Sequence, residues 1–465
     1  MSTATDGLTA SLEKMRREEL PQVAMQTFAE HYRRLTEGER GMLPESELVP
    51  VDELPGMEDL PEEDADAAQA LDRAVVIRLN GGLGTSMGMT GPKSLVEAKD
   101  GLTFLDIAAR QVLGLRERHG ARLPLVLMNS FRTRGDTLAA LERYPELPVD
   151  VPLDFLQGKV PKVRADDLQP VSWDADPELE WAPPGHGDVY TSLVASGMLE
   201  ALLERGYQHA LVSNIDNVGS VLEPRILAWF ARKGVPFLME VTARTDADRK
   251  GGHLARRGEG GGLVLREIAQ TPEEDRDAFQ DVARHRFFNT NTLWIDLRQL
   301  GQALERQGGL LGLPLIVNRK HVDPSDASSP EVLQLESAMG AAIGVFDGAA
   351  ALRVPRTRFA PVKTTNDLLV LRSDAYRLTA EACVELAAER GGRPPFVDLD
   401  PDHFKLLGGF EARFPSGPPS LAACERLTVA GDVAFGAGVL VRGSVSVEHA
   451  GEGQLRIDDG AVLEG

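Results

Sequence analysis

Residues 74–94 read AVVIRLNGGLGTSMGMTGPKS and join an apolar run to a glycine-rich segment. The first part of this stretch, Ala74-Val75-Val76-Ile77, is an apolar run of mostly β-branched residues and predicts a buried strand. The part from Arg78 to Ser94 follows directly and contains five glycines and a single lysine, Lys93. Glycines after a strand let backbone N–H groups approach an anion closely, and a lysine adds positive charge. The stretch therefore predicts a phosphate-binding loop; a tight turn with a surface lysine is the alternative.

Neither of the two standard phosphate motifs fits this loop. The dinucleotide fingerprint needs G-x-G-x-x-G, but Met87 occupies the third glycine position and glycine follows one residue later, at Gly88. The P-loop needs a glycine directly before its lysine, and here Pro92 stands between Gly91 and Lys93. Proline has no N–H group and cannot join a ring of backbone donors. A third kind of phosphate-binding loop is expected.

Short apolar runs alternate with helical patterns on both sides of the loop. Strands are predicted at residues 74–77, 123–128, 210–212 and 236–239, and helices around residues 104–118 and 194–205. Such alternation favours an α/β fold with a mainly parallel sheet and helices on both faces. Ligands bind at the carboxyl ends of the strands in such sheets.

The two ends of the chain have different patterns. Apolar positions from Leu8 to Leu35 predict an amphipathic helix that Pro21 breaks into two, and residues 44–66 are an acidic, proline-rich connection. Glycines and prolines at 391–395 indicate a boundary. Beyond it, apolar residues at intervals of six favour a parallel β-helix over an ordinary β-meander, at Leu427, Val433, Val439 and Val445. The predicted units are residues 1–70, 71–390 and 391–465.

Composition narrows the class of protein. The chain has 465 residues, 42% of them hydrophobic, and a formal net charge of -21. An acidic chain argues against non-specific binding to nucleic acid or to an anionic membrane. Two cysteines give no disulfide framework, and no apolar run approaches the roughly 20 residues of a membrane helix. A cytoplasmic protein without nucleic-acid or membrane partners is expected.

Long blocks in register resemble the eukaryotic-type UTP–glucose-1-phosphate uridylyltransferase family, also called UDP-glucose pyrophosphorylases. The family's loop has the form LNGGLGTSMG..GPKS, which residues 79–94 match. Further blocks follow in the family's order: PLVLMNSF (124–131), WAPPGHGD (181–188), VSNIDN (212–217), FNTN (288–291) and VPRTRFAPVKTT (354–365). The resemblance implies a nucleotide-sugar transferase domain with a Rossmann-like sheet, followed by a short C-terminal left-handed parallel β-helix.

The implied reaction joins UTP and glucose 1-phosphate to give UDP-glucose and pyrophosphate, with Mg²⁺ as cofactor. The attacking group is a phosphate oxygen that is already ionised, so positioning and charge neutralisation are the main requirements. By resemblance, Lys93 holds the β- and γ-phosphates, and Lys363 bridges the sugar phosphate and the nucleotide phosphate. Asp216, which follows a predicted strand, is the best metal ligand; Asp188 is a weaker one.

The substrate-binding residues are also implied by the resemblance. Gly81 and Gly82 would lie against the uridine, Gln157 and Gly185 would bind uracil, and Met128 would pack beside the base. The family reads FNQSRYPR where this chain has FLQGKVPK (155–162), so only the glutamine itself matches there. His186 would contact a phosphate. The sugar hydroxyls would be bound by asparagines that could instead be turn residues, namely Asn214, Asn289 and Asn291. Lys250 matches a family block, and its role could be structural.

Several alternatives stay open at this point. An N-acetylhexosamine-1-phosphate uridylyltransferase or a broad-specificity sugar pyrophosphorylase shares a glycine-rich loop. A catalytically silent nucleotide-sugar sensor would have no need of Lys93, Asp216 and Lys363 together. The β-helix could form a homo-oligomer through its exposed end, or could only cap the catalytic domain.

Overall fold

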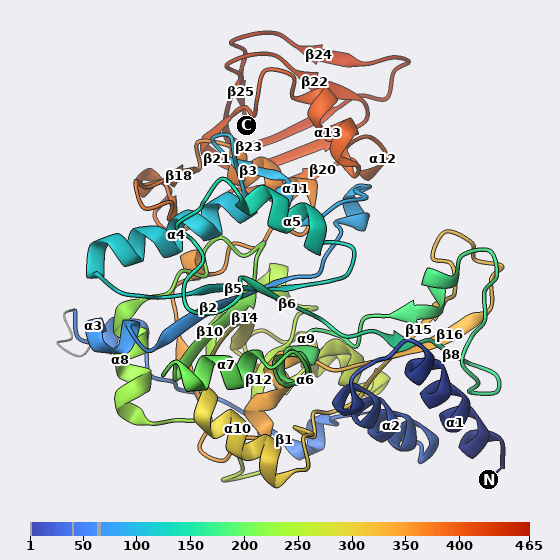
Figure 1. Cartoon of the computed structure of the whole chain (residues 1–465). Helices are drawn as coiled ribbons and strands as arrows, with labels where there is room; N and C mark the ends of the chain where they lie inside the picture. Colours follow the sequence, from blue (N-terminus) through green and yellow to red (C-terminus); the bar gives the residue numbers. More distant parts are fainter. Residues whose placement is uncertain (1, 40, 63–66) are drawn as a thin grey trace.

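A computed structural model describes residues 2–39, 41–62 and 67–465 of the chain (Figure 1). Residues 63–66, at the end of the predicted acidic connection, lie outside these ranges. The first described segment is a helical hairpin of α1 (Ser2–Arg17) and α2 (Gln22–Thr36), with Pro21 directly before the second helix. The predicted break at Pro21 is confirmed. The rest of the connection is less irregular than predicted, because it forms strand β1 (Leu48–Pro50) at the edge of the main sheet.

A ten-stranded mixed sheet forms the centre of the described chain. Its main strand order is β1-β12-β14-β10-β2-β5-β6, with β11, β13 and β17 attached beside it. The bounds are β2 Ala74–Asn80, β5 Leu125–Asn129, β6 Asp154–Leu156, β10 His209–Asn214, β11 Phe237–Ala243, β12 His253–Arg257, β13 Leu263–Arg266, β14 Phe287–Asp296 and β17 Ala350–Arg353. All four predicted strands are present, each shifted or extended by a few residues.

Alternate residues of the central strands face opposite sides of the sheet. In β2, Ala74 and Val76 belong to one hydrophobic core, whereas Val75 and Ile77 belong to the other. This period of two, in a strand whose every residue is buried, is why the run reads as continuously apolar. The first core contains side chains of α3 (Ala67–Leu71), α4 (Phe104–His119), α8 (Pro224–Lys233) and α11 (Thr365–Arg372). The second contains side chains of α6 (Asp188–Ala195), α7 (Met198–Glu204) and α10 (Leu297–Arg306).

The predicted α/β fold with helices on both faces of a large sheet is therefore confirmed (Figure 1). Strands β10, β2, β5 and β6 are parallel neighbours, as are β11 and β17. Strand β14 is antiparallel to both β10 and β11 and joins these two parallel parts, which the sequence pattern did not predict. The helix predicted at residues 194–205 is also interrupted, because Gly197 has φ 73° and separates α6 from α7.

Smaller elements surround the main sheet. The remaining helices are α5 (Arg134–Leu141), α9 (Arg276–Gln280), α12 (Pro401–Phe404) and α13 (Leu407–Arg413). Short sheets form from β3 (Glu97–Lys99) with β4 (Leu102–Thr103), β7 (Val160–Pro161) with β9 (Trp181–Ala182), β18 (Tyr376–Leu378) with β19 (Val384–Leu386), and β8 (Val163–Arg164) with β15 (Ile316–His321) and β16 (Glu331–Glu336). Within the described ranges, every helix is too short or too polar to cross a membrane.

The C-terminal part consists of parallel strands. One sheet has the order β20 (Phe396–Leu399), β21 (Ser420–Ala430), β23 (Leu440–Glu448) and β25 (Val462–Glu464), and a second pairs β22 (Val433–Phe435) with β24 (Leu455–Ile457). Every pairing in both sheets is parallel. The residues predicted at intervals of six are all buried: Leu427, Val433, Val439 and Val445. Their side chains join the same hydrophobic core as α4, α8 and α11.

Candidate active site

The glycine-rich loop leaves the carboxyl end of β2 and closes on itself. Gly84 and Gly88 have φ 62° and 73° and flank a single 3₁₀ turn, Thr85–Met87. The N–H of Lys93 donates to the carbonyl of Gly82 at 3.1 Å, which brings the end of the loop back to its beginning. Pro92 stands directly before a second 3₁₀ turn, Lys93–Leu95. The loop therefore places the Lys93 side chain at the carboxyl ends of the parallel strands.

Three segments distant in sequence meet at Lys93. Its ammonium group forms an ion pair with Asp216 Oδ2 at 2.6 Å and also donates to the carbonyl of Val362. The N–H of Val362 in turn donates to the carbonyl of Asp216 at 3.2 Å. The side chains of Lys93 and Asp216 are 15% and 19% exposed, so the pair is sheltered but accessible. The structure thus places Lys93, Asp216 and the segment that carries Lys363 together.

One carboxylate oxygen of Asp216 has no hydrogen-bond donor among the described residues. The contact with Lys93 uses Oδ2, and no residue of the described ranges donates a hydrogen bond to Oδ1. Those ranges also contain no cluster of three or more His, Cys, Asp or Glu side chains arranged for a metal. A lone carboxylate beside the glycine-rich loop suits Mg²⁺, which commonly binds one or two carboxylates together with substrate phosphates.

Lys363 and Glu267 are two further ionisable residues near each other at this edge. Lys363 is exposed, and its backbone N–H donates to Asp367 Oδ2 at 2.8 Å, within the box that caps α11. Burial raises the pKa of Glu267 to about 7, and the nearby Lys363 ammonium opposes this shift. Glu267 was missed by the sequence analysis. In the sequence, Glu267 is a single glutamate that follows an apolar run. A glutamate in that position is common in surface turns and does not by itself indicate a binding site.

The residues expected to bind uridine lie around Gln157. A Cβ on Gly81 would lie 2.2 Å from Gln157 Oε1, so only glycine leaves room for this amide. A Cβ on Gly82 would meet open space. Gln157 itself is tied to the end of β5, because its N–H donates to the carbonyl of Asn129 at 2.8 Å. Met128 is 2% exposed in β5, next to Leu79 and Phe155 in the register of the sheet.

The turn at Gly185 and His186 packs against residues 337–339. Gly185 has φ 79°, and a Cβ there would lie 2.4 Å from the carbonyl oxygen of Ser337. The N–H of Met339 donates to Nδ1 of His186 at 2.9 Å, so the neutral ring carries its proton on Nε2. Desolvation lowers the pKa of His186 to about 4, which keeps the ring neutral near pH 7. His186 can therefore donate one hydrogen bond to a substrate oxygen.

The three candidate asparagines occupy two places. Asn214 is the last residue of β10, two residues before Asp216. Asn289 and Asn291 lie at a bulge of β14, where Asn291 has φ 54° and the two side chains are linked at 2.9 Å. The N–H of Asn289 donates to the carbonyl of Gly252 at 3.1 Å. A Cβ on Gly252 would lie 2.6 Å from the Glu267 carboxylate, so Asn289, Gly252 and Glu267 are neighbours.

Two further candidates have other surroundings. Asp188, the second metal candidate, accepts hydrogen bonds from the N–H of Gly158 and the hydroxyl of Ser192, both at 2.6 Å. Lys250 is exposed in the segment before β12, and the adjacent Gly251 packs against the ring of Phe288.

Comparisons with known proteins identify the family. The family model of UTP–glucose-1-phosphate uridylyltransferase matches residues 25–442. A relative from Solanum tuberosum is 42% identical over 90% of this chain and 84% of its own, and one from Saccharomyces cerevisiae is 40% identical over 85% and 77%. Both are named UTP–glucose-1-phosphate uridylyltransferase.

Solved structures are similar over nearly the whole length. A mutant UDP-glucose pyrophosphorylase from Leishmania major in complex with UDP-glucose has a TM-score of 0.93 and 45% identity, covering 98% of each chain. A Trypanosoma brucei structure has a TM-score of 0.91 and 46% identity, covering 99% of this chain and 98% of its own. The chain belongs to the UTP–glucose-1-phosphate uridylyltransferase family.

Proposed function

We propose that the chain catalyses the reaction of UTP with α-D-glucose 1-phosphate to give UDP-glucose and pyrophosphate. The observation that carries this proposal is the meeting of Lys93, Asp216 and the Lys363 segment beside the glycine-rich loop. Relatives of this name at about 40% identity and a neighbour bound to UDP-glucose support it.

The reaction exchanges one phosphorus–oxygen bond for another. A phosphate oxygen of glucose 1-phosphate bonds to the α-phosphorus of UTP, and the bond from that phosphorus to the bridging oxygen breaks, releasing pyrophosphate. No protein nucleophile is needed. We assign Lys93 to the departing β- and γ-phosphates and Lys363 to the phosphate of the attacking sugar. Their positive charges neutralise the negative charge that builds up around the α-phosphorus.

Asp216 is the residue that would hold Mg²⁺. When bound, the ion would neutralise phosphate charge near the α-phosphorus. In the free protein Lys93 shares this carboxylate, so the Lys93–Asp216 ion pair keeps both groups at the edge of the sheet before substrate arrives. Removal of the metal with a chelator should abolish turnover, and added Mg²⁺ should restore it.

The remaining polar groups suit the uridine and the glucose. We assign the uracil edge to the amide of Gln157 and the backbone of Gly185, with Gly81 and Gly82 against the nucleoside and Met128 behind them. His186 would donate its Nε2–H to a phosphate oxygen. The sugar hydroxyls would meet Asn214, Asn289, Asn291 and the carboxylate of Glu267, whose neighbour Gly252 bonds to Asn289.

The C-terminal part would be the short left-handed β-helix that the family resemblance implies. Parallel pairing of Leu427 with Val445, eighteen positions later, fits three faces of six residues per coil. Val462 is 49% exposed on β25, the last strand of its sheet, so this end could pair with a second copy of the chain. Light scattering at several protein concentrations tests that assembly. Two free cysteines suit a cytoplasmic enzyme.

The deciding experiment incubates the full chain with UTP, Mg²⁺ and a panel of sugar 1-phosphates, and measures nucleotide sugar and pyrophosphate. Equimolar UDP-glucose and pyrophosphate, with glucose 1-phosphate as the best acceptor, is the expected result. Faster turnover of N-acetylglucosamine 1-phosphate would replace glucose by an N-acetylhexosamine. UTP binding without any turnover would identify a sensor instead.

A further inference from the structure

Asp188 connects two loops that the proposed function assigns to uridine. It is the first residue of α6 and follows directly after His186 and Gly187. Its Oδ2 accepts the backbone N–H of Gly158, the residue after Gln157, at 2.6 Å. The hydroxyl of Ser192, one turn later in α6, donates to the same oxygen at 2.6 Å. One carboxylate thus ties the Gln157 loop to the His186 turn.

The contact between Gly158 and Asp188 is close. A Cβ on Gly158 would lie 3.2 Å from Asp188 Oδ2, tighter than most real Cβ contacts, so the loop approaches the carboxylate with little room to spare. On the other side of the loop, the side-chain amide of Gln157 lies directly against Gly81. The Gln157 side chain therefore contacts the glycine-rich loop, while the next residue, Gly158, is hydrogen-bonded to Asp188 of α6.

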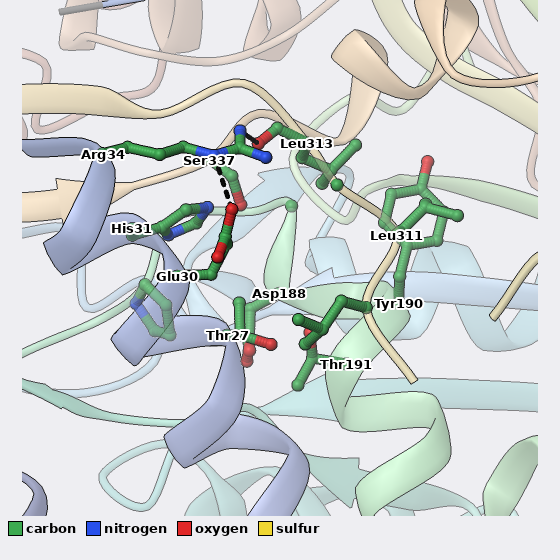
Figure 2. Close-up of a pocket in the computed structure, with 14 residues that line it drawn as sticks. Thr27, Glu30, His31, Arg34, Asp188, Tyr190, Thr191, Leu311, Leu313 and Ser337 are labelled. Carbon is green, nitrogen blue, oxygen red and sulfur yellow. Dashed lines mark hydrogen bonds and ion pairs between the residues drawn. The ribbon is translucent and has the colours of Figure 1, made fainter. Parts of the chain in front are cut away.

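Packing alone does not hold the Gln157 loop. A cavity of about 450 Å³ borders it, lined by Leu20 and Pro21 of the hairpin, by Phe131, by Met198, and by residues 154–159. This side of the loop faces open volume, and two backbone hydrogen bonds hold the loop beside it: the Gln157 N–H donates to Asn129 and the Gly158 N–H donates to Asp188. Loss of the bond to Asp188 leaves the peptide group after Gln157 free to shift toward the cavity. Asp188 and Thr191 line this cavity too, and they also line a smaller cavity between α2 and α6 together with Thr27 (Figure 2).

Asp188 is an unusual residue to bury. It is 5% exposed, and burial raises the pKa of its carboxyl group. No cation of the described part of the chain forms an ion pair with it; its partners are the Gly158 N–H and the Ser192 hydroxyl. A buried carboxyl without a counter-ion is costly unless hydrogen bonds compensate it. For Asp188 these compensating hydrogen bonds come from the Gln157 loop and from α6, so its burial ties the two segments together.

We propose that Asp188 is a positioning residue: through Gly158 it holds the amide of Gln157 in the orientation that recognises uracil. The inference rests on the proposed use of UTP. Uracil presents a donor at N3 and an acceptor at O4, and cytosine presents the reverse. A freely rotating amide can satisfy either base, whereas a fixed one leaves the wrong base unpaired, which is strongly disfavoured in a buried site. Asp188 would thus set both the affinity for UTP and the preference for UTP over CTP.

The test measures kcat and KM for UTP, CTP and glucose 1-phosphate in Asp188→Ala and Asp188→Asn, with UTP binding by calorimetry. Asp188→Ala should raise the KM for UTP by about tenfold, the equivalent of one lost hydrogen bond to a charged group. The preference for UTP over CTP should fall several-fold, while the KM for glucose 1-phosphate changes less than about twofold. Asp188→Asn keeps an acceptor oxygen and should lie between Asp188→Ala and the wild type.

Asp106→Asn is the matched control. Asp106 is also a buried carboxylate at the start of a helix and accepts bonds from Thr103 and Tyr144, away from the candidate site. The Asp106→Asn substitution should lower the melting temperature without changing the preference for UTP over CTP. If Asp188→Ala does not fold, the preference measured with Asp188→Asn decides the matter.

Two results would overturn the role of Asp188. One is an unchanged UTP to CTP preference in both variants; the other is an equal loss for all three substrates with a lower melting temperature. If the wild-type enzyme makes UDP-glucose, either of these results leaves the proposed function intact. A wild type that makes no UDP-glucose contradicts the proposed function itself.

Discussion

At the scale of single residues, the two lysines of the site have different surroundings. Lys93 is paired with Asp216, whereas Lys363 is exposed at the start of the segment that caps α11. Lys363→Ala should therefore lower kcat by roughly 100-fold, the loss expected for one charge-stabilising group, and shift the melting temperature little. Lys233→Ala, at an exposed lysine in α8, is the control for removing a surface charge. A Lys363→Ala enzyme with near-normal kcat would remove Lys363 from the mechanism.

The raised pKa of Glu267 predicts that replacing this residue changes stability and sugar binding in opposite directions. Its folded pKa, about 7, lies above the ordinary glutamate value of 4.5, so between these values the folded chain binds more protons than the unfolded chain. The free energy of unfolding therefore loses a contribution as pH rises from 4.5 to 7. Glu267→Gln should remove that loss, and its stability relative to wild type should increase over this window.

The same Glu267→Gln variant should bind the sugar less well. We expect its KM for glucose 1-phosphate to rise by about tenfold at pH 8, where the wild-type carboxylate is ionised and accepts hydroxyl hydrogen bonds. Denaturant titrations and initial rates at several pH values measure both effects. An unchanged KM would exclude Glu267 from the sugar site.

At the scale of elements, a buried ion pair anchors the segment that carries Lys363. The Arg358 guanidinium donates to both carboxylate oxygens of Glu240 in β11, at 2.7 and 2.8 Å, and Glu240 is fully buried. Glu240→Gln would leave the guanidinium buried without its counter-ion, so the free energy of unfolding should fall by about 3–5 kcal/mol. Turnover should fall with it, because this segment carries Lys363 and is bonded through Arg358 and Ala360 to Asn217, the residue after Asp216.

An exposed ion pair supplies the control for this prediction. Arg319 and Glu331 pair at 2.7 Å with both side chains more than half exposed. Glu331→Gln should cost less than about 1 kcal/mol, since water screens exposed pairs. Urea unfolding of both variants measures the difference. Equal losses in the two variants would show that the buried pair does not anchor the segment.

At the scale of the whole molecule, the C-terminal strands share a core with the catalytic sheet. Phe404, Phe410 and Leu421 belong to the same buried cluster as Leu368 of α11, and Leu406 touches Gly88 of the glycine-rich loop. Residues 71–390 and 391–465 should therefore unfold together, in a single calorimetric transition. Residues 1–390 alone should aggregate, because their part of this core would be exposed. Two separate transitions would contradict the shared core.

Several features could be predicted because their cause is local. Pro21 cannot continue a helix, so the N-terminal break follows from that residue alone. The apolar run before Arg78 is a strand because its residues are buried on both faces, which produces a continuous apolar pattern. By contrast, Gly197 interrupts a helical pattern whose composition otherwise continues, and β14 reverses its direction relative to its neighbours because of pairing with distant strands.

The glycine-rich loop, the alternation of strands and helices, and the family could be recognised from the amino-acid sequence, since each depends on residues close together along the chain. Which charged groups meet depends on the folded structure. Lys93 and Asp216 are 123 positions apart, and Asp188 holds a loop 30 positions before it. Glu267 gains its raised pKa from burial, which no short stretch encodes. Desolvation and ion pairing depend on what folds around a group, so these properties arise only when the sheet brings distant segments to one edge.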